Sequence, residues 1–135
     1  MITFHSLKTP ILISLGAICG SLSRHYIGWY FQPFEKMFPF GTFLVNISGC
    51  FLVGLFVGLT VASGFPKLDE FRMFFVVGFL GSYTTFSAYA LQTLLLTKNH
   101  HYPQALLYCL TTPVCCLVAV FAGYFIAKAI KGLFT

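Results

Sequence analysis

The chain has 135 residues, of which 58% are hydrophobic and only 8% are charged, and its formal net charge is +5. A soluble domain carries about 25% charged residues, so this composition excludes a soluble globular protein and predicts an integral membrane protein. The basic residues form no cluster of the kind that binds nucleic acid, so we expect no nucleic-acid partner and relate the charge to membrane topology.

Four apolar segments are long enough to cross a lipid bilayer, which takes about 20 residues. They lie at about 9–31, 40–63, 71–97 and 103–127. Little of the chain lies outside them, so we expect one all-α transmembrane domain over 1–135, with four helices and no soluble catalytic domain. The N-terminal region lacks a basic segment followed by a small-residue cleavage site, so we expect the first helix to be retained.

The first predicted span carries Gly16 and Gly20, four residues apart, a spacing that lets helices approach closely in lipid. Arg24 lies in the outer half of this span. Its side chain can extend to the membrane interface, or it can act as an internal hydrogen-bond anchor. We count Arg24 among the structural residues and leave the choice open.

The second predicted span repeats the close-packing spacing at Gly54 and Gly58. No span contains a carboxylate, because the acidic residues all fall in predicted loops: Glu35, Asp69 and Glu70. A proton-coupled cation exporter requires a carboxylate within the membrane, and a cation channel with acidic rings requires several. No nucleophile lies near a base, so the sequence also argues against an enzyme.

The third predicted span contains the stretch GFLGSYTTFSAY, from Gly78 to Tyr89. Polar groups at membrane depth are costly unless they are paired or face a wet cavity. Gly, Ser, Thr and Tyr also rank low as helix formers, which predicts a break between Gly81 and Thr84. The freed carbonyls could hold a monovalent cation. Hydrogen bonds between helices are the simpler interpretation, but they explain a run of six polar or aromatic residues poorly.

The fourth predicted span presents Tyr108, Thr112 and Cys116 at intervals of four residues, which places them in one stripe along a helix. Pro113 lies within the same helix and would leave the carbonyl of Cys109 without its usual donor. The stripe therefore places a phenol, a hydroxyl and a thiol on one face of the predicted helix.

Neutral hydrogen-bond donors are common in the spans. Asn46 offers an NH2 group, and serine, threonine and tyrosine side chains offer hydroxyls. Phe86 and Tyr89 are three residues apart and share a helix face. Because the edges of aromatic rings are electropositive, these rings can help to stabilise an anion.

The basic residues are nearly balanced across the membrane. With four spans, one side holds five of the 8 and the other holds three. The five are Lys8, Lys67, Arg72, Lys128 and Lys131, and the three are Arg24, Lys36 and Lys98. Such a weak bias predicts insertion in both orientations.

Three motifs, taken in order, resemble those of the Fluc (CrcB) fluoride channels. They are Gly16-Ala-x-x-Gly20-Ser-x-x-Arg24, Gly41-Thr-Phe-Leu-Val-Asn46-x-x-Gly49-Cys-Phe-x-x-Gly54 and Gly78-x-x-Gly81-x-x-Thr84-Thr-Phe86-Ser. The resemblance covers the whole chain. It implies passive export of fluoride from the cytoplasm across the bacterial inner membrane, which lowers fluoride toxicity.

The resemblance also implies an antiparallel, dual-topology homodimer in lipid, with two fluoride pores and one central structural sodium ion. Backbone carbonyls of Gly81 and Thr84 would bind the sodium. The implied pore residues are Asn46, Phe86, Tyr89, Tyr108, Thr112 and Cys116. Tyr89 stands where the family has its second pore phenylalanine, so Tyr89→Phe is expected to be tolerated.

Two other functions remain as alternatives. A small dual-topology multidrug-type exporter also has four short helices, but the absence of a carboxylate within the spans argues against it. A membrane scaffold without transport activity would not need the polar run at 82–87. Pairing with a second homologue, in place of a homodimer, stays open.

Overall fold

The computed structural model of the chain describes residues 7–35, 37–60 and 68–133. In these ranges the regular secondary structure is entirely helical. The elements are α1 (Lys8–Phe31), η1 (Gln32–Phe34), α2 (Phe40–Thr60), α3 (Leu68–Arg72), η2 (Met73–Leu80), α4 (Gly81–Tyr83), α5 (Phe86–Lys98) and α6 (Tyr102–Gly132). The last helix ends later than the expected 127, and the expected end of the second span at 63 lies outside the described residues.

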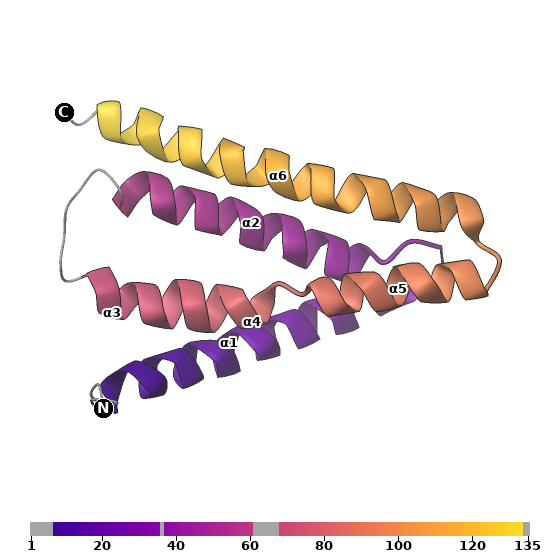
Figure 1. Ribbon diagram of the computed structural model, residues 1–135, viewed down its shortest axis with the longest axis horizontal. Coiled ribbons are helices and arrows are strands. Elements are labelled where there is room, and N and C mark those ends of the chain that lie inside the picture. Colours follow the sequence, from indigo (N-terminus) through magenta and orange to yellow (C-terminus); the bar gives the residue numbers. More distant parts are fainter. Residues whose placement is uncertain (1–6, 36, 61–67, 134–135) are drawn as a thin grey trace, which may run out of the picture.

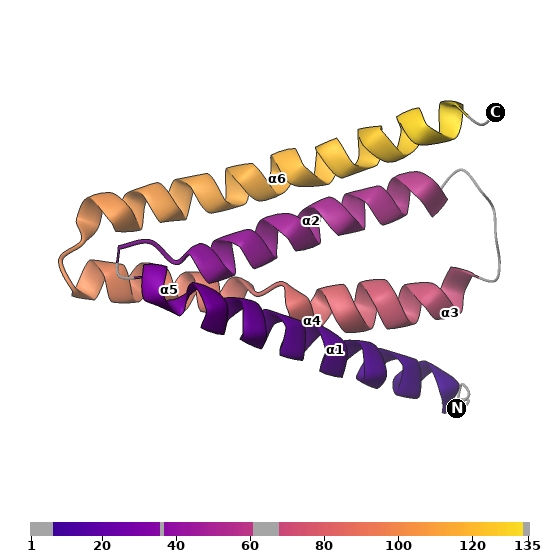
Figure 2. The same ribbon diagram turned by 180° about the vertical axis from the view of Figure 1, so that it is seen from behind.

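The helices lie side by side as long rods (Figure 1). α3, η2, α4 and α5 follow one line and form a single interrupted rod. In both views α2 lies between this rod and α6 (Figures 1 and 2). α2 packs mainly on α6, and α1 packs mainly on η2 and α4. The start of α1 and the end of α6 lie at the same end of the molecule.

Within the described residues, three helical segments are long and apolar enough to cross a membrane: Phe40–Thr60, Asp69–Lys98 and Tyr102–Gly132. Large apolar side chains cover the outside of α6, namely Leu106, Leu110, Val114, Leu117, Phe121 and Phe125. Together these features make the chain an integral, multi-pass membrane protein. α1 has 24 residues, a sufficient length, but it is not among the three, so the fourth span stays a prediction.

The close approach predicted for Gly16 and Gly20 is confirmed. A Cβ atom at Gly16 would collide with the carbonyl oxygen of Phe74, and one at Gly20 would collide with that of Phe79. Backbone therefore meets backbone where α1 crosses η2. Small residues allow this contact because burial of apolar side chains gives little stability between helices that are already in lipid.

The second glycine pair serves the contact between α2 and α6. A Cβ atom at Gly54 would overlap the carbonyl oxygen of Val120, and one at Gly58 would lie 2.5 Å from the Cβ atom of Ala127. The buried residues in this half of α6 are small as well, namely Ala119, Gly123 and Ala127, so the two backbones pack closely together.

Gly54→Val is therefore expected to lower the free energy of unfolding by about 3 kcal/mol, because overpacking against backbone cannot relax through a rotamer change. The shift would be measured as a lower thermal midpoint in detergent. Gly28→Ala is the matched control, since a Cβ atom there meets nothing within 4 Å. Equal midpoints for the two variants would show that α2 and α6 do not pack as described.

Aromatic rings stack along the first half of the interrupted rod. Phe71, Phe75, Phe79 and Tyr83 follow one another at four-residue intervals, with ring centroids 5.4, 5.6 and 5.5 Å apart and nearly parallel planes. η2, which carries the middle of this stack, is a π-helix, a form that is rare and often found at functional sites. The hydroxyl of Tyr83 then lies 2.9 Å from that of Ser48, which ties the end of the stack to α2.

Candidate functional site

The interrupted rod breaks at Thr84 and Thr85. Thr84 has φ −76° and ψ 150°, and Thr85 has φ −150° and ψ 112°, so both residues are extended. Gly81, where the sequence predicted the break to begin, keeps helical angles of −63° and −30°. The break therefore lies at the end of the predicted stretch and reaches one residue past it, at β-branched residues that favour extended backbone.

Asn46 of α2 holds the break in place. The backbone N–H of Thr85 donates to Oδ1 of Asn46 at 2.8 Å, and Nδ2 of Asn46 donates to the carbonyl oxygen of Thr85 at 3.2 Å. Both residues are buried. The hydroxyl of Thr85 also accepts the N–H of Ala88 at 3.2 Å, so Thr85 is the N-cap of α5. The side chain of Asn46 thus accepts the backbone N–H that would donate to a backbone carbonyl in a continuous helix.

This arrangement takes the usual donors away from Gly81 and Thr84, the two residues predicted to bind a cation. In a continuous helix the N–H of Thr85 would donate to the carbonyl of Gly81, and that of Ala88 to the carbonyl of Thr84. Here the first N–H donates to Asn46 and the second to the hydroxyl of Thr85. Both carbonyls lie where a cation could take the place of those donors.

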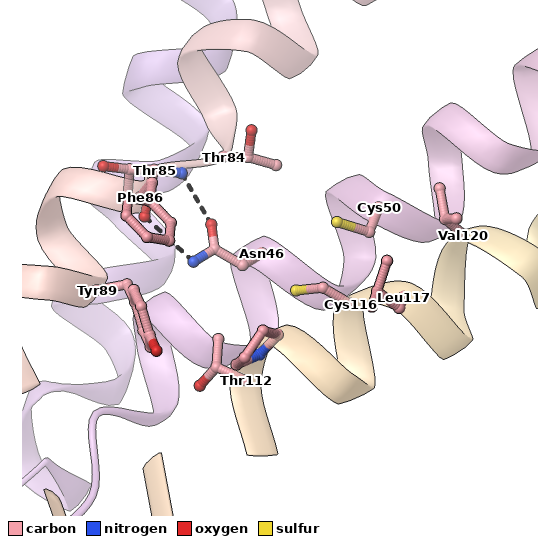
Figure 3. A pocket seen from close by; sticks show the side chains of 11 residues that line it. Asn46, Cys50, Thr84, Thr85, Phe86, Tyr89, Thr112, Cys116, Leu117 and Val120 are labelled. Carbon is pink, nitrogen blue, oxygen red and sulfur yellow. Dashed lines mark hydrogen bonds between the residues drawn. The ribbon is translucent and has the colours of Figure 1, made fainter. Parts of the chain in front are cut away.

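A pocket of about 450 Å³ lies beside the break. It is lined by Asn46, Cys50, Thr84, Thr85, Phe86, Tyr89, Thr112, Pro113, Cys116, Leu117 and Val120. All of the predicted pore residues except Tyr108 are in this set. Figure 3 shows the amide of Asn46 between the break on one side and Thr112 of α6 on the other. The structure brings together residues that are far apart in the sequence.

The lining of the pocket contains no charged side chain and offers an anion few free hydrogen-bond donors. The two bonds of Asn46 to Thr85 use its oxygen and one amide hydrogen, which leaves the second hydrogen for a ligand. Phe86 and Tyr89 lie 5.2 Å apart with their planes at 47°, and the side chain of Phe86 is 78% exposed. A neutral amide and aromatic rings can hold an anion without binding it as a buried cation would.

Only two of the three residues in the stripe on α6 line this pocket. Thr112 and Cys116 line it, but the hydroxyl of Thr112 donates to the carbonyl oxygen of Tyr108 at 2.8 Å. Tyr108 itself is fully buried, and its hydroxyl donates to Oε1 of Gln92 at 2.9 Å. Sequence reasoning did not single out Gln92. Its position three residues after Tyr89, inside a predicted span, was the available signal.

Part of the polar run forms structural hydrogen bonds. The hydroxyl of Ser82 donates to the carbonyl oxygen of Ala17 in α1 at 2.9 Å, and that of Thr84 donates to the carbonyl of Leu80 at 2.9 Å. The simpler interpretation, hydrogen bonds between helices, is therefore confirmed for Ser82 but not for Thr84, whose bond stays within its own rod. The features that shape the pocket are then the extended backbone at Thr84 and Thr85 and the N-cap of α5.

A second pocket, of about 440 Å³, adjoins the first at Thr85. Its lining includes Arg24, which is half-buried, as well as Glu35 and Gln92. Oε1 of Glu35 accepts the N–H of Gly41 at 3.1 Å, at the start of α2, where a carboxylate is favourable. Thr85 lines both pockets, so the residue that Asn46 holds in place is common to the two.

Comparison with known proteins matches residues 11–124 to the family described as "CrcB-like protein, Camphor Resistance (CrcB)". A protein of Synechococcus sp. named "Fluoride-specific ion channel FluC" is 43% identical over 125 residues, 91% of this chain and 95% of its own length. Proteins with the same name from Methylobacterium radiotolerans and Helicobacter pylori (strain ATCC 700392 / 26695) are 38% and 43% identical, over 94% and 89% of this chain and 90% and 93% of their own lengths.

Proposed function

This chain belongs to the CrcB family, and from that premise we propose that it is a fluoride-selective channel. It lets fluoride leave the cytoplasm passively across the bacterial cell membrane and so lowers fluoride toxicity. The relatives named above are ion channels, and the protein is accordingly not an enzyme. The observation that supports the proposal most directly is that Asn46, Phe86 and Tyr89 line one pocket beside the helix break.

The chemistry of this pocket suits a small, strongly hydrated anion. Fluoride must exchange its water for donors placed close by, and it must bind weakly enough to leave again. The lining offers an amide hydrogen, aromatic rings and two thiols, and it contains no charged side chain. A buried cation would hold fluoride too tightly, and a buried carboxylate would repel it.

Purified protein in liposomes tests the proposal. With internal potassium fluoride and valinomycin, a fluoride electrode should record efflux, whereas liposomes with internal chloride should show almost no chloride efflux. Transport of both anions alike would contradict selectivity. Efflux no faster than from protein-free liposomes would favour the scaffold alternative, and proton-coupled export of an organic cation would favour the exporter.

We propose further that two antiparallel copies form a dual-topology homodimer with two pores. The near-balance of basic residues supports this arrangement, and so does the 78% exposure of Phe86 at an open pocket, since a second copy could cover that ring.

A reporter fused to the C-terminus should accordingly be found on both sides of the membrane, in similar amounts. Paired reporters that are active on opposite sides, such as alkaline phosphatase and green fluorescent protein, would measure this. A single orientation throughout would contradict the homodimer and indicate a partner chain.

A structural sodium ion is the proposed partner of the carbonyls freed at the break. Gly81 and Thr84 have lost their helical donors, and both line a small pocket of about 190 Å³ together with Gly49 of α2. Carbonyl oxygens suit a hard monovalent cation, so the residues present fit the ion. When bound, sodium would supply positive charge to carbonyls that lipid cannot satisfy.

Removal of sodium is therefore expected to reduce dimer stability and fluoride efflux together, because the freed carbonyls would lack a partner. Protein purified with N-methylglucamine in place of sodium would be compared by size-exclusion chromatography and by the efflux assay. A sodium gradient, in contrast, should not drive fluoride uphill. Full stability and efflux without sodium would contradict the proposed site.

A further inference from the structure

Two features of this chain meet at one carbonyl oxygen in α6. Pro113 lies inside the helix and has no N–H, so it cannot donate to the carbonyl of Cys109 four residues earlier. Within a membrane no water replaces the missing donor, and an unmet carbonyl is costly. The fold must therefore provide another donor or accept the loss of stability.

That donor comes from Tyr89. Its hydroxyl donates to the carbonyl oxygen of Cys109 at 2.8 Å and lies 3.4 Å from the sulfur of the same residue. The hydroxyls nearby in α6 are engaged elsewhere, since Thr111 donates to Leu107 and Thr112 to Tyr108. The hydrogen bond that the structure gives this carbonyl therefore crosses from α5 to α6.

The same bond fixes an aromatic ring in the wall of the pocket. The Tyr89 ring is buried, with centroids 5.2 Å from Phe86 and 5.3 Å from Tyr108. A phenylalanine would have the same two ring neighbours, but nothing would hold its far end. The hydroxyl thus adds a fixed point at the tip of the ring, opposite its attachment to α5.

We propose that Tyr89 is a positioning residue whose role depends on Pro113. The proline frees the Cys109 carbonyl, the tyrosine hydroxyl occupies it, and the pair joins α5 to α6 at the pocket while it orients the ring. This replaces the expectation that Tyr89→Phe is tolerated: the change should be harmful in this chain because Pro113 is present. The effect on transport rests on the proposed fluoride channel, whereas the effect on stability does not.

Three variants test the pair: Tyr89→Phe, Pro113→Ala and the double variant. Tyr89→Phe should lower the ratio of folded to unfolded protein by about tenfold, the usual result of leaving a buried acceptor unmet. It should also slow fluoride efflux, because the ring loses its fixed point. In the double variant the loss of stability should be largely reversed, because the N–H that Pro113→Ala introduces can donate to the Cys109 carbonyl, whereas efflux should stay slow because the ring still lacks its hydroxyl.

Tyr26→Phe is the matched control, because it removes a hydroxyl from a ring that is 63% exposed. Unfolding midpoints in detergent and fluoride efflux would be measured for each protein. The proposal is overturned if Tyr89→Phe behaves like Tyr26→Phe, or if its loss of stability persists in the double variant, which would show that the hydroxyl acts elsewhere. If wild-type liposomes release no fluoride, the channel proposal fails, while the midpoints still decide the pairing.

Discussion

Asn46→Asp is expected to reduce fluoride efflux by at least about a hundredfold. A carboxylate at this position faces the pocket, and two like charges about 4 Å apart repel by about 4 kcal/mol at an effective dielectric constant of 20. The substitution also removes the amide hydrogens, so the carbonyl of Thr85 loses its donor at 3.2 Å. Both the negative charge and the loss of the amide donor would therefore slow the passage of fluoride.

Asn46→Ala separates these two causes. It removes both bonds to Thr85 but adds no charge, so its loss of efflux should be clearly smaller than that of Asn46→Asp if repulsion dominates. Size-exclusion chromatography would verify that both variants keep the assembly of the wild type. Undiminished efflux in Asn46→Asp would mean that fluoride takes a route away from this pocket.

Phe86→Ile is expected to abolish efflux or reduce it by about a hundredfold, with little change in the fold of the single chain. The Phe86 side chain is 78% exposed and lines the pocket, so it adds little to internal packing. Isoleucine is apolar and of similar bulk, but it lacks the electropositive ring edge that can contact an anion. The loss should therefore appear in transport and not in the unfolding midpoint.

Leu91→Ile serves as the control for this variant, since Leu91 lies on the same helix, is 55% exposed and is absent from the pocket lining. Efflux from both proteins would be measured in parallel at equal protein-to-lipid ratios. Equal rates in the two variants would contradict a role for the aromatic ring in the pathway.

Local sequence signals were sufficient for the helices and for the packing glycines. Apolar runs of about 20 residues and the spacing of Gly16 with Gly20 depend on near neighbours along the chain, so they can be read directly. The prediction of a break from Gly, Ser and Thr was also local, and it was nearly right. α1 is the weaker case, because its polar residues keep it below the hydropathy of the other spans.

Contacts between distant residues could not be predicted in this way. The break lies at Thr84 and Thr85 because Asn46, 39 residues earlier than Thr85, binds both backbone groups of Thr85. The partner of the Tyr89 hydroxyl is likewise 20 residues away along the chain. Propensity describes what a segment prefers alone, whereas these bonds depend on which helices become neighbours.

The aromatic stack along η2 constrains the number of residues in this segment more than the identity of its exposed residues. Its rings recur at every fourth residue from Phe71 to Tyr83, and the last of them meets Ser48 immediately before the break. Inserting or deleting one residue in this segment would turn everything beyond it by roughly 80–100°, the rotation per residue of a π- or α-helix. The rings would lose their neighbours, and Thr85 would turn away from Asn46. Exposed positions such as Val77 should therefore accept other apolar side chains, whereas a change of one residue in length should not be tolerated.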